Sequence, residues 1–211
     1  MGRQTAPHLC CIPESNYVSG QVLIRRWRSG PVNAEDLPLE SPRNADVERL
    51  FHINVNCTNF ERSLAFYRLI GFEIVLDFTT APGAHRSFGE AGLGPILGLP
   101  GSCDGRAALL SLSDDRHAVR LDLIEWKSPR VPARRRESLA QPGIARLCLK
   151  TTDAEAVHAR LSAAGHNAYS PPIQVSLGGS RIKVFCVEDP DGVVIEFMQF
   201  LGEVHAPFSN T

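Results

Sequence analysis

From about residue 51 onward, hydrophobic and polar positions alternate regularly, and the same pattern recurs further along the chain. Residues 51–71 read FHINVNCTNFERSLAFYRLIG and residues 145–165 read ARLCLKTTDAEAVHARLSAAG. In both stretches the apolar–polar alternation predicts a strand, and the 3.6-residue period that follows predicts an amphipathic helix. Asn59 and Asp153 stand at N-cap positions, and a glycine closes each helix. The two stretches form an internal repeat.

A second similarity closes each copy. Residues 121–126 (LDLIEW) are similar to residues 192–197 (GVVIEF) at an offset of 71 residues, which pairs Glu125 with Glu196. The strand–helix stretches at the start of each copy repeat at an offset of 94 residues, which is 23 more than the offset at the end. The first copy therefore contains 23 additional residues, which we place in the Gly- and Pro-rich segment 78–105. A long loop inside a compact domain is more often a lid or a binding loop. Each copy predicts the order strand–helix–strand–strand–strand.

The paired copies predict an α+β fold, in which two βαβββ modules form one curved mixed sheet around a central cavity. We expect module one over residues 46–127 and module two over residues 142–201. A polar surface linker at residues 128–141 joins them within one domain that spans residues 46–205.

The two ends of the chain have a different character. Residues 1–45 contain scattered Pro and Gly and predict an extended N-terminal arm, in which only residues 17–27 (YVSGQVLIRRW) have the pattern of a strand. Residues 206–211 are expected to form a tail.

The alternation also predicts which side chains face the cavity, because successive residues of a strand point to opposite faces. Ile53 and Val55 would pack against the helix, and the polar residues between them would line a cavity. In the last strand of module one, Ile124 and Trp126 would face the helix. The residues that this pattern turns toward the cavity are His52, Asn54, Glu125, Arg146, Cys148 and Glu196.

The motifs FHINVNCTNFERSLAFY, LDLIEW, GIARLCLKTTD and EDPDGVVIEF, in paired modules, resemble the vicinal oxygen chelate superfamily over about residues 47–201. Glyoxalase I, bleomycin-resistance proteins and extradiol dioxygenases belong to this superfamily. The resemblance implies a homodimer and a metal ion held by the first and last strands of each module. By position these ligands are His52, Glu125, Arg146 and Glu196. The family has His where this chain has Arg146, and an arginine stays protonated and cannot be a metal ligand.

One interpretation keeps the metal. His52, Glu125 and Glu196 would hold a divalent ion, and this donor set suits Zn²⁺, Ni²⁺, Mn²⁺, Fe²⁺ or Mg²⁺. The protein would then be a lyase or isomerase that acts next to a carbonyl, with Glu125 or Glu196 as the catalytic proton carrier. Arg146 would hold an anionic group of the substrate. His85, in the long loop, could swing into the cavity as an acid or base and is a further substrate-binding candidate. Asn54 and Cys148 complete the expected substrate-binding set.

The other interpretation lets the guanidinium replace the metal. Arg146 would pair with Glu125 and Glu196, which leaves a metal-free ligand-binding or resistance protein, or metal-free acid–base chemistry with His52. A third hypothesis, an extradiol-type dioxygenase, needs two His and one carboxylate for iron, and Arg146 disfavours it.

Composition excludes several other classes. Lys and Arg number 22 against 23 Asp and Glu, a formal net charge of −1, which is untypical of a dedicated nucleic-acid binder. No apolar run reaches the roughly 18 residues of a membrane span, and we find no signal-peptide pattern. Six cysteines without a C-x-x-C pair predict reduced thiols. We therefore expect a cytoplasmic protein with a small-molecule substrate, without nucleic-acid or membrane partners.

Overall fold

The computed structural model describes most of the chain beyond its N-terminal quarter. The described residues are 10–12, 28–30, 47–132, 137–177 and 180–202. By its contacts the chain divides into two units, residues 1–49 and 50–211. In the first unit, β1 (Cys10–Ile12) and β2 (Arg28–Gly30) pair antiparallel. The strand predicted over residues 17–27 and the tail at residues 206–211 lie outside the described residues.

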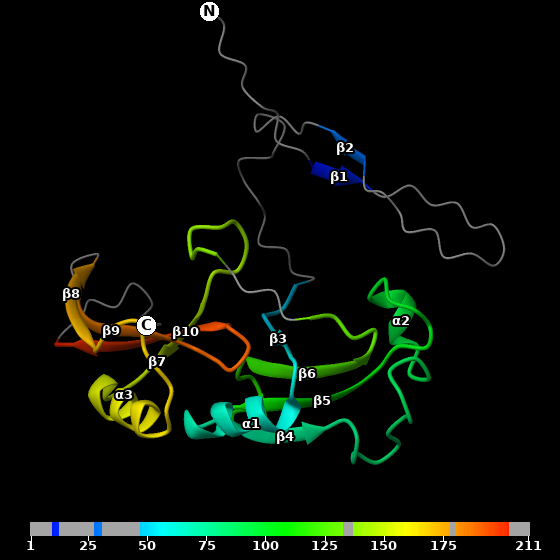
Figure 1. Cartoon of the computed structure of the whole chain (residues 1–211), viewed down its shortest axis with the longest axis horizontal. Helices are drawn as coiled ribbons and strands as arrows, with labels where there is room; N and C mark the ends of the chain where they lie inside the picture. The colour runs from blue at the N-terminus through cyan, green and yellow to red at the C-terminus, as the bar shows by residue number, and fades with distance from the viewer. Residues whose placement is uncertain (1–9, 13–27, 31–46, 133–136, 178–179, 203–211) are drawn as a thin grey trace, which may run out of the picture. The chain divides into compact units, whose positions relative to one another are not determined.

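The second unit contains two modules with the same order of elements (Figure 1). The elements of module one are β3 (His52–Cys57), α1 (Phe60–Leu69), β4 (Glu73–Asp77), α2 (Leu93–Ile96), β5 (Asp104–Ser111) and β6 (Arg120–Ser128). The elements of module two are β7 (Leu147–Lys150), α3 (Ala154–Ala163), β8 (Ile173–Leu177), β9 (Ser180–Glu188) and β10 (Val194–Leu201). Apart from the short α2, both modules run β–α–β–β–β, which confirms the predicted fold.

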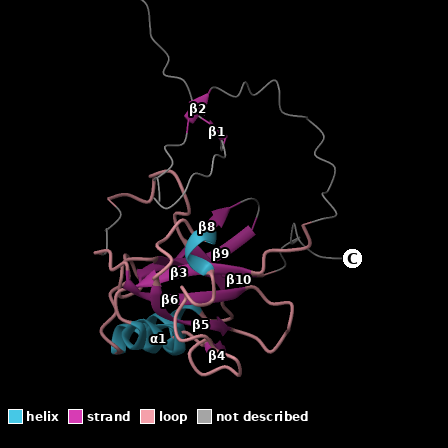
Figure 2. Cartoon of the chain, turned by 90° about the vertical axis from the view of Figure 1, so that its right-hand side faces the viewer, coloured by secondary structure: helices cyan, strands magenta, loops and turns pink. Residues whose placement is uncertain are grey.

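The strands are hydrogen-bonded in two four-stranded mixed sheets, one for each module, where the sequence predicted one curved sheet. Their strand orders, β3-β6-β5-β4 and β7-β10-β9-β8, are equivalent. In each sheet the first and last strands of the module run parallel, and the other neighbours run antiparallel. Figure 2 shows α1 against one side of the module-one strands, which leaves the opposite face for other contacts.

Both long helices begin and end as the sequence predicts. Asn59 and Asp153 each accept a hydrogen bond from the backbone N–H three residues further on, at 2.9 and 3.0 Å. Gly71 and Gly165, after the helices, have φ of +100° and +83°, a region that glycine enters at low cost. Neither these helices nor any other in the described part of the chain is long and apolar enough to span a bilayer.

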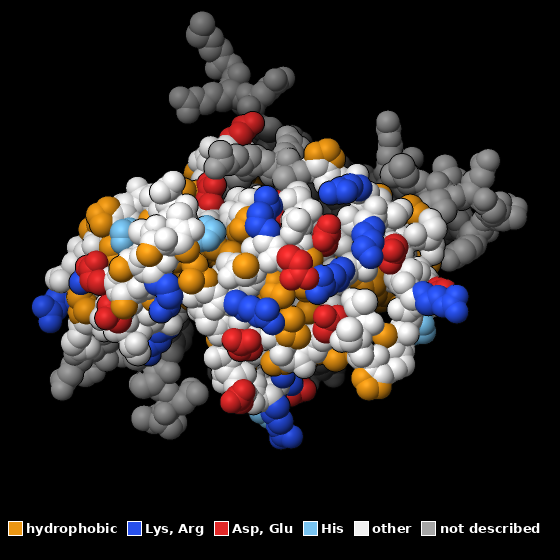
Figure 3. All heavy atoms as spheres, turned by 60° about the horizontal axis from the view of Figure 1, so that its bottom comes forward, with side chains coloured by type: hydrophobic (Ala, Val, Ile, Leu, Met, Phe, Trp, Pro, Cys, Tyr) orange, Lys and Arg blue, Asp and Glu red, His pale blue; other side chains and the backbone are white. Residues whose placement is uncertain are grey.

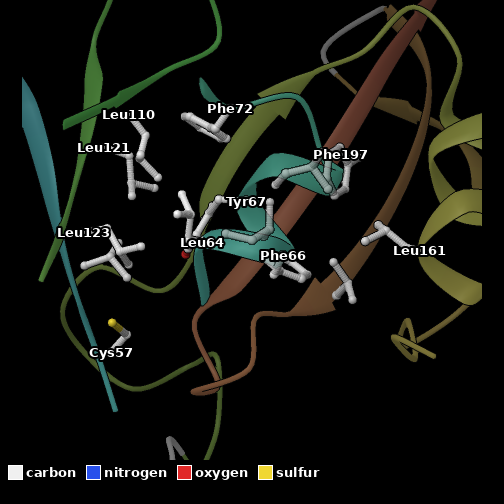
Figure 4. Packing of buried hydrophobic residues seen from close by; sticks show 14 of the residues in the cluster. Cys57, Leu64, Phe66, Tyr67, Phe72, Leu110, Leu121, Leu123, Leu161 and Phe197 are labelled. Atoms are coloured by element: carbon white, nitrogen blue, oxygen red, sulfur yellow. The ribbon is translucent and has the colours of Figure 1, made fainter. Parts of the chain in front are cut away.

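The helix sides of the two sheets share one hydrophobic core (Figure 4). Phe66 and Tyr67 of α1 are buried in the same cluster as Leu161 of α3 and Phe197 of β10. The apolar faces of both modules meet here, which leaves the other faces of the sheets for a candidate site.

A polar contact fixes the turn between β9 and β10 of module two against module one. Tyr67 Oη donates to Asp189 Oδ2 at 2.9 Å, and the Thr58 amide donates to Asp191 Oδ2 at 2.9 Å. Arg62 Nη2 lies 2.7 Å from Asp191 Oδ1. Burial raises the pKa of Asp189. Burial also acts to raise the pKa of Asp191, but the hydrogen bonds from Thr58 and Arg62 outweigh it and lower that pKa.

Candidate functional site

A cavity of about 1340 Å³ lies over the face of the module-one sheet that points away from α1. The strand residues whose side chains share this face are His52, Asn54, Asn56, Asp122, Ile124 and Trp126. Parts of the long insertion between residues 78 and 99 form one wall, and residues 144–147 and 191–194 of module two also line the cavity. The cavity is larger than the roughly 300–1,000 Å³ of an ordinary small-molecule site, so it has room for a small organic molecule.

The pairing of β3 with β6 decides which β6 side chains enter the cavity. The parallel register sets Asn54 opposite Asp122 and Cys57 opposite Glu125. Residues opposite each other in a sheet share a face. Cys57 is buried in the core beside α1, so Glu125 lies on that side and does not line the cavity. The prediction that Glu125 faces the cavity is wrong, and Asp122 occupies the expected position.

Glu125 instead binds the start of a helix. Its Oε2 accepts a hydrogen bond from the N–H of Phe60, the first residue of α1, at 2.9 Å. In module two, Gln199 Oε1 accepts from the N–H of Ala154, the first residue of α3, at 3.0 Å. Glu125 is therefore equivalent to Gln199, and the last strands repeat at 74 residues and not at 71. At this offset Asp122 is the counterpart of Glu196.

Asp122 forms a partly buried pair with His52 in the cavity. His52 Nε2 lies 4.0 Å from Asp122 Oδ2, and Asn54 Nδ2 donates to the same oxygen at 3.1 Å. The other oxygen, Oδ1, is buried and has no hydrogen-bond partner among the described residues. Burial raises the pKa of Asp122, against the hydrogen bond from Asn54 and the attraction of His52, which lower it. Asp122 is the functional candidate that the sequence analysis missed.

The equivalent place in module two holds an ion pair. Arg146 Nε donates to Glu196 Oε2 at 2.8 Å, which raises the pKa of Arg146. In the sheet, Glu196 lies between Cys148 on β7 and Cys186 on β9. Burial, followed by the charge of Glu196, raises the pKa of Cys148 to about 11, so this thiol stays protonated at neutral pH. It is therefore not an activated nucleophile.

The structure brings only part of the predicted set together. His52, Asn54, His85 and Arg146 all line the cavity. Glu125, Cys148 and Glu196 do not line it, although Glu196 contacts Arg146 directly. The two predicted carboxylates therefore do not meet at one point in the chain.

The donor set of one chain does not fit the metal site that the family resemblance implies. Among the described residues, no group of three or more His, Cys, Asp or Glu side chains is placed to hold an ion. His52 and Asp122 offer one pair of donors, but the counterpart pair contains Arg146, which only donates hydrogen bonds and repels cations. These two pairs contain one histidine, His52, whereas an extradiol iron site needs two.

Solved structures support the fold. A glyoxalase family protein from Bacillus cereus is 17% identical with a TM-score of 0.62, and the match covers 77% of this chain and all of that one. Glyoxalase I of Leishmania major is 14% identical, with a TM-score of 0.48 and coverage of 72% and 87%. A glyoxalase family protein from Enterococcus faecalis is 22% identical, with a TM-score of 0.48 and coverage of 72% and 97%. At these identities the likeness concerns the fold, and only the first TM-score carries weight.

Comparison of sequences leads to the same family. No curated protein matches this chain. A family model described as Glyoxalase/Bleomycin resistance protein/Dioxygenase superfamily matches residues 49–197, from just before β3 to the middle of β10. With its repeated βαβββ topology, the chain belongs to the Glyoxalase/Bleomycin resistance protein/Dioxygenase superfamily.

Proposed function

We propose that the protein is a glyoxalase-like lyase or isomerase that acts next to the carbonyl of a small molecule by metal-independent acid–base chemistry. The observation that carries this proposal is the His52–Asp122 pair, at 4.0 Å, inside a cavity that Arg146 also lines. The pair supplies a base with a carboxylate beside it, and the arginine supplies a fixed positive charge.

The proposed reaction begins when the His52 imidazole, through the ring nitrogen that does not face Asp122, removes a proton from the carbon next to the carbonyl. The C–H electron pair moves into the carbonyl and forms an enolate, while the imidazole becomes an imidazolium that Asp122 stabilises. Arg146 binds an anionic group of the substrate or the enolate oxygen. Return of the proton to another carbon gives an isomerase, and loss of a leaving group from the next carbon gives a lyase.

Proton exchange tests the proposal without knowledge of the natural substrate. The protein is incubated in D₂O with EDTA and a panel of 2-oxo acids and α-hydroxy ketones, and exchange next to the carbonyl is followed by proton NMR. We expect exchange by the wild type, a rate at least 100-fold lower for His52→Ala, and an unchanged rate for the surface control His117→Ala. A wild-type rate in His52→Ala, or no exchange with any compound, contradicts the proposal.

A metal-free binding or resistance protein is the second candidate, and the Arg146–Glu196 ion pair favours it. This pair is the part of the predicted Arg146–Glu125–Glu196 cluster that exists, and it needs no reaction to explain it. Calorimetry distinguishes the two candidates, because a binding protein would bind compounds of the same panel without any His52-dependent exchange.

We also propose that the protein acts as a homodimer in the cytoplasm. Strand β8 is exposed along its whole length, and Ile173, Val175 and Leu177 on one of its faces are 49%, 39% and 66% exposed. Apolar surface of this kind is typical of an interface. By contrast, Figure 3 shows acidic and basic side chains interspersed on the face that it draws. Light scattering should give a dimer that Val175→Glu converts to a monomer, and a monomeric wild type would contradict this proposal.

A further inference from the structure

An aromatic pair lines the cavity beyond the His52–Asp122 pair. Trp126 lies on β6, four residues after Asp122, and so on the same face of the strand. Its indole N–H donates to Asn56 Oδ1 at 2.8 Å. Phe88, from the long insertion, meets the indole edge-to-face, with ring centroids 5.2 Å apart and an interplanar angle of 74°. The hydrogen bond and the ring contact fix the orientation of the Trp126 ring.

A glycine on the neighbouring strand makes room for this pair. Gly105 of β5 stands opposite Trp126 in the sheet. A Cβ at this position would lie 2.8 Å from Phe88 Cε2 and 2.6 Å from the carbonyl oxygen of Glu125. Any larger residue would therefore displace Phe88, so the phenyl ring can pack over the sheet only because residue 105 has no side chain.

The insertion that carries Phe88 is itself closely packed. The Gly89 N–H donates to the Cys103 carbonyl at 2.8 Å, and a Cβ on Gly89 would lie only 2.2 Å from the Gly101 oxygen. The two sides of the insertion thus meet backbone to backbone directly after Phe88. The aromatic pair is set in place before a ligand arrives, which reduces the entropy lost on binding.

The cavity consequently has two chemically different ends. Asp122, with His52 beside it, marks an acid–base end, and Trp126 with Phe88 marks an aromatic end. Ile124 lies between them on the same face of β6. Four residues of a strand separate the two ends by about 13 Å along the backbone.

We infer that the ligand class is an aryl-substituted 2-oxo acid or related carbonyl compound, with its carbonyl at the His52 end and a planar aromatic ring against Trp126. This inference rests on the proposed function, which supplies the carbonyl end. Roughly four to six chain atoms between carbonyl and ring match the separation, since both side chains and the ligand fill part of it. Ring-to-ring contact adds up to about tenfold in affinity beyond the area that it buries.

Calorimetry in EDTA with three probes tests the inference. The probes are 6-phenyl-2-oxohexanoate, 6-cyclohexyl-2-oxohexanoate and 2-oxohexanoate, which share the carbonyl end. We expect the phenyl compound to bind at least tenfold more tightly than 2-oxohexanoate and several-fold more tightly than the cyclohexyl compound. Trp126→Ala should remove the phenyl advantage and change the affinity for 2-oxohexanoate less than twofold, and Trp126→Phe should keep most of it.

A second measurement does not depend on the folding of Trp126→Ala. The chain has two tryptophans, so Trp27→Phe leaves Trp126 as the only indole fluorophore. The phenyl probe should change its fluorescence with the same saturation curve as calorimetry, and Phe88→Ala should weaken that binding several-fold.

The outcomes separate this inference from the proposed function. A Trp126-dependent phenyl advantage without His52-dependent proton exchange supports the aromatic end and overturns the proposed reaction. His52-dependent exchange with equal affinities for the phenyl and unsubstituted probes overturns the inference and leaves the reaction standing. The inference is also overturned if none of the probes binds, or if Trp126→Ala keeps the phenyl advantage.

Discussion

The two modules repeat one backbone and carry different chemistry on it. At equivalent positions, module one has His52 beside Asp122, and module two has Arg146 beside Glu196. The first pair contains an imidazole, which can accept and donate a proton, whereas the second is a charge pair whose guanidinium never gives up its proton. Duplication of a fold therefore preserves strand register, and a single His-to-Arg difference between the copies changes what the repeated position can do.

The turns before the last strands differ in the same way. In module two, Asp191 accepts hydrogen bonds from Thr58 and Arg62 of module one. The equivalent position of module one, 74 residues earlier, is His117, which lies in an exposed turn. The turn at Asp191 therefore joins the two modules through its side chain.

The largest expected effect is on catalysis, in which the His52–Asp122 pair and the Arg146–Glu196 pair should have different roles. His52→Ala should lower kcat at least 100-fold with little change in KM, because it removes the proton acceptor. Arg146→Ala should mainly raise KM, by about tenfold, because it removes a charge that binds substrate. Steady-state kinetics with the best substrate of the exchange panel measures both. Equal losses of kcat in the two variants would remove the functional distinction between the modules.

A large stability effect should separate the two turns. Asp191→Ala should lower the free energy of unfolding by about 2–4 kcal/mol, because a partly buried acceptor and its partners lose their hydrogen bonds. His117→Ala should stay within about 0.5 kcal/mol. The folded-state pKa of Asp191 is lowered, so its contribution is present above the ordinary aspartate pKa and is lost as pH falls through the folded value.

Urea unfolding at pH 7 and at pH 3 measures this effect for both turn variants. The difference between wild type and Asp191→Ala should shrink at the lower pH. A difference that grows in acid would show that another group, and not the Asp191 carboxylate, joins the modules.

A smaller effect tests the corrected position of Glu125. Glu125→Ala and Gln199→Ala should each cost about 1 kcal/mol, because each removes the acceptor of the first N–H of a helix. Glu125→Gln should keep both stability and proton exchange, since an amide oxygen still accepts that bond. Loss of proton exchange in Glu125→Gln would mean that Glu125 takes part in the reaction, and it would contradict the register derived for the last strands.

An effect no larger than this concerns the partly buried carboxylate of the pair in module one. Because burial raises the folded-state pKa of Asp122, wild-type stability falls as pH rises from the ordinary aspartate pKa to the folded value. Asp122→Asn lacks this loss and should be more stable by about 1 kcal/mol at neutral pH, with a smaller gain in acid. Thermal unfolding between pH 3 and pH 7 measures the gain. A variant less stable than the wild type at neutral pH would mean that His52 more than compensates the buried charge.

The fold could be predicted from the sequence, because several independent features of the pattern indicate the same strands and helices. Alternation, N-caps and closing glycines locate both copies, and the ungapped offset of 94 places His52 and Arg146 at equivalent positions. These features depend on neighbouring residues alone. They need no knowledge of which strands pair.

The candidate site was predicted less well, because it depends on pairing between distant strands. The shared letters Ile-Glu aligned Glu125 with Glu196, and that error of three residues moved Glu125 to the wrong face and hid Asp122. A shift by an odd number of residues reverses the faces of a strand. Only the register of β3 with β6 corrects it. The position of Phe88 was equally beyond the sequence, since it depends on how the long insertion packs.

The central claim is that the His52–Asp122 pair works without a metal ion. The most direct test is the rate of proton exchange in protein freed of metal by chelation, measured before and after addition of Zn²⁺, Ni²⁺, Mn²⁺, Fe²⁺ or Mg²⁺. The account predicts that the metal-free rate persists and that no ion changes it more than about twofold. Exchange that disappears on chelation and returns with one equivalent of an ion would contradict it.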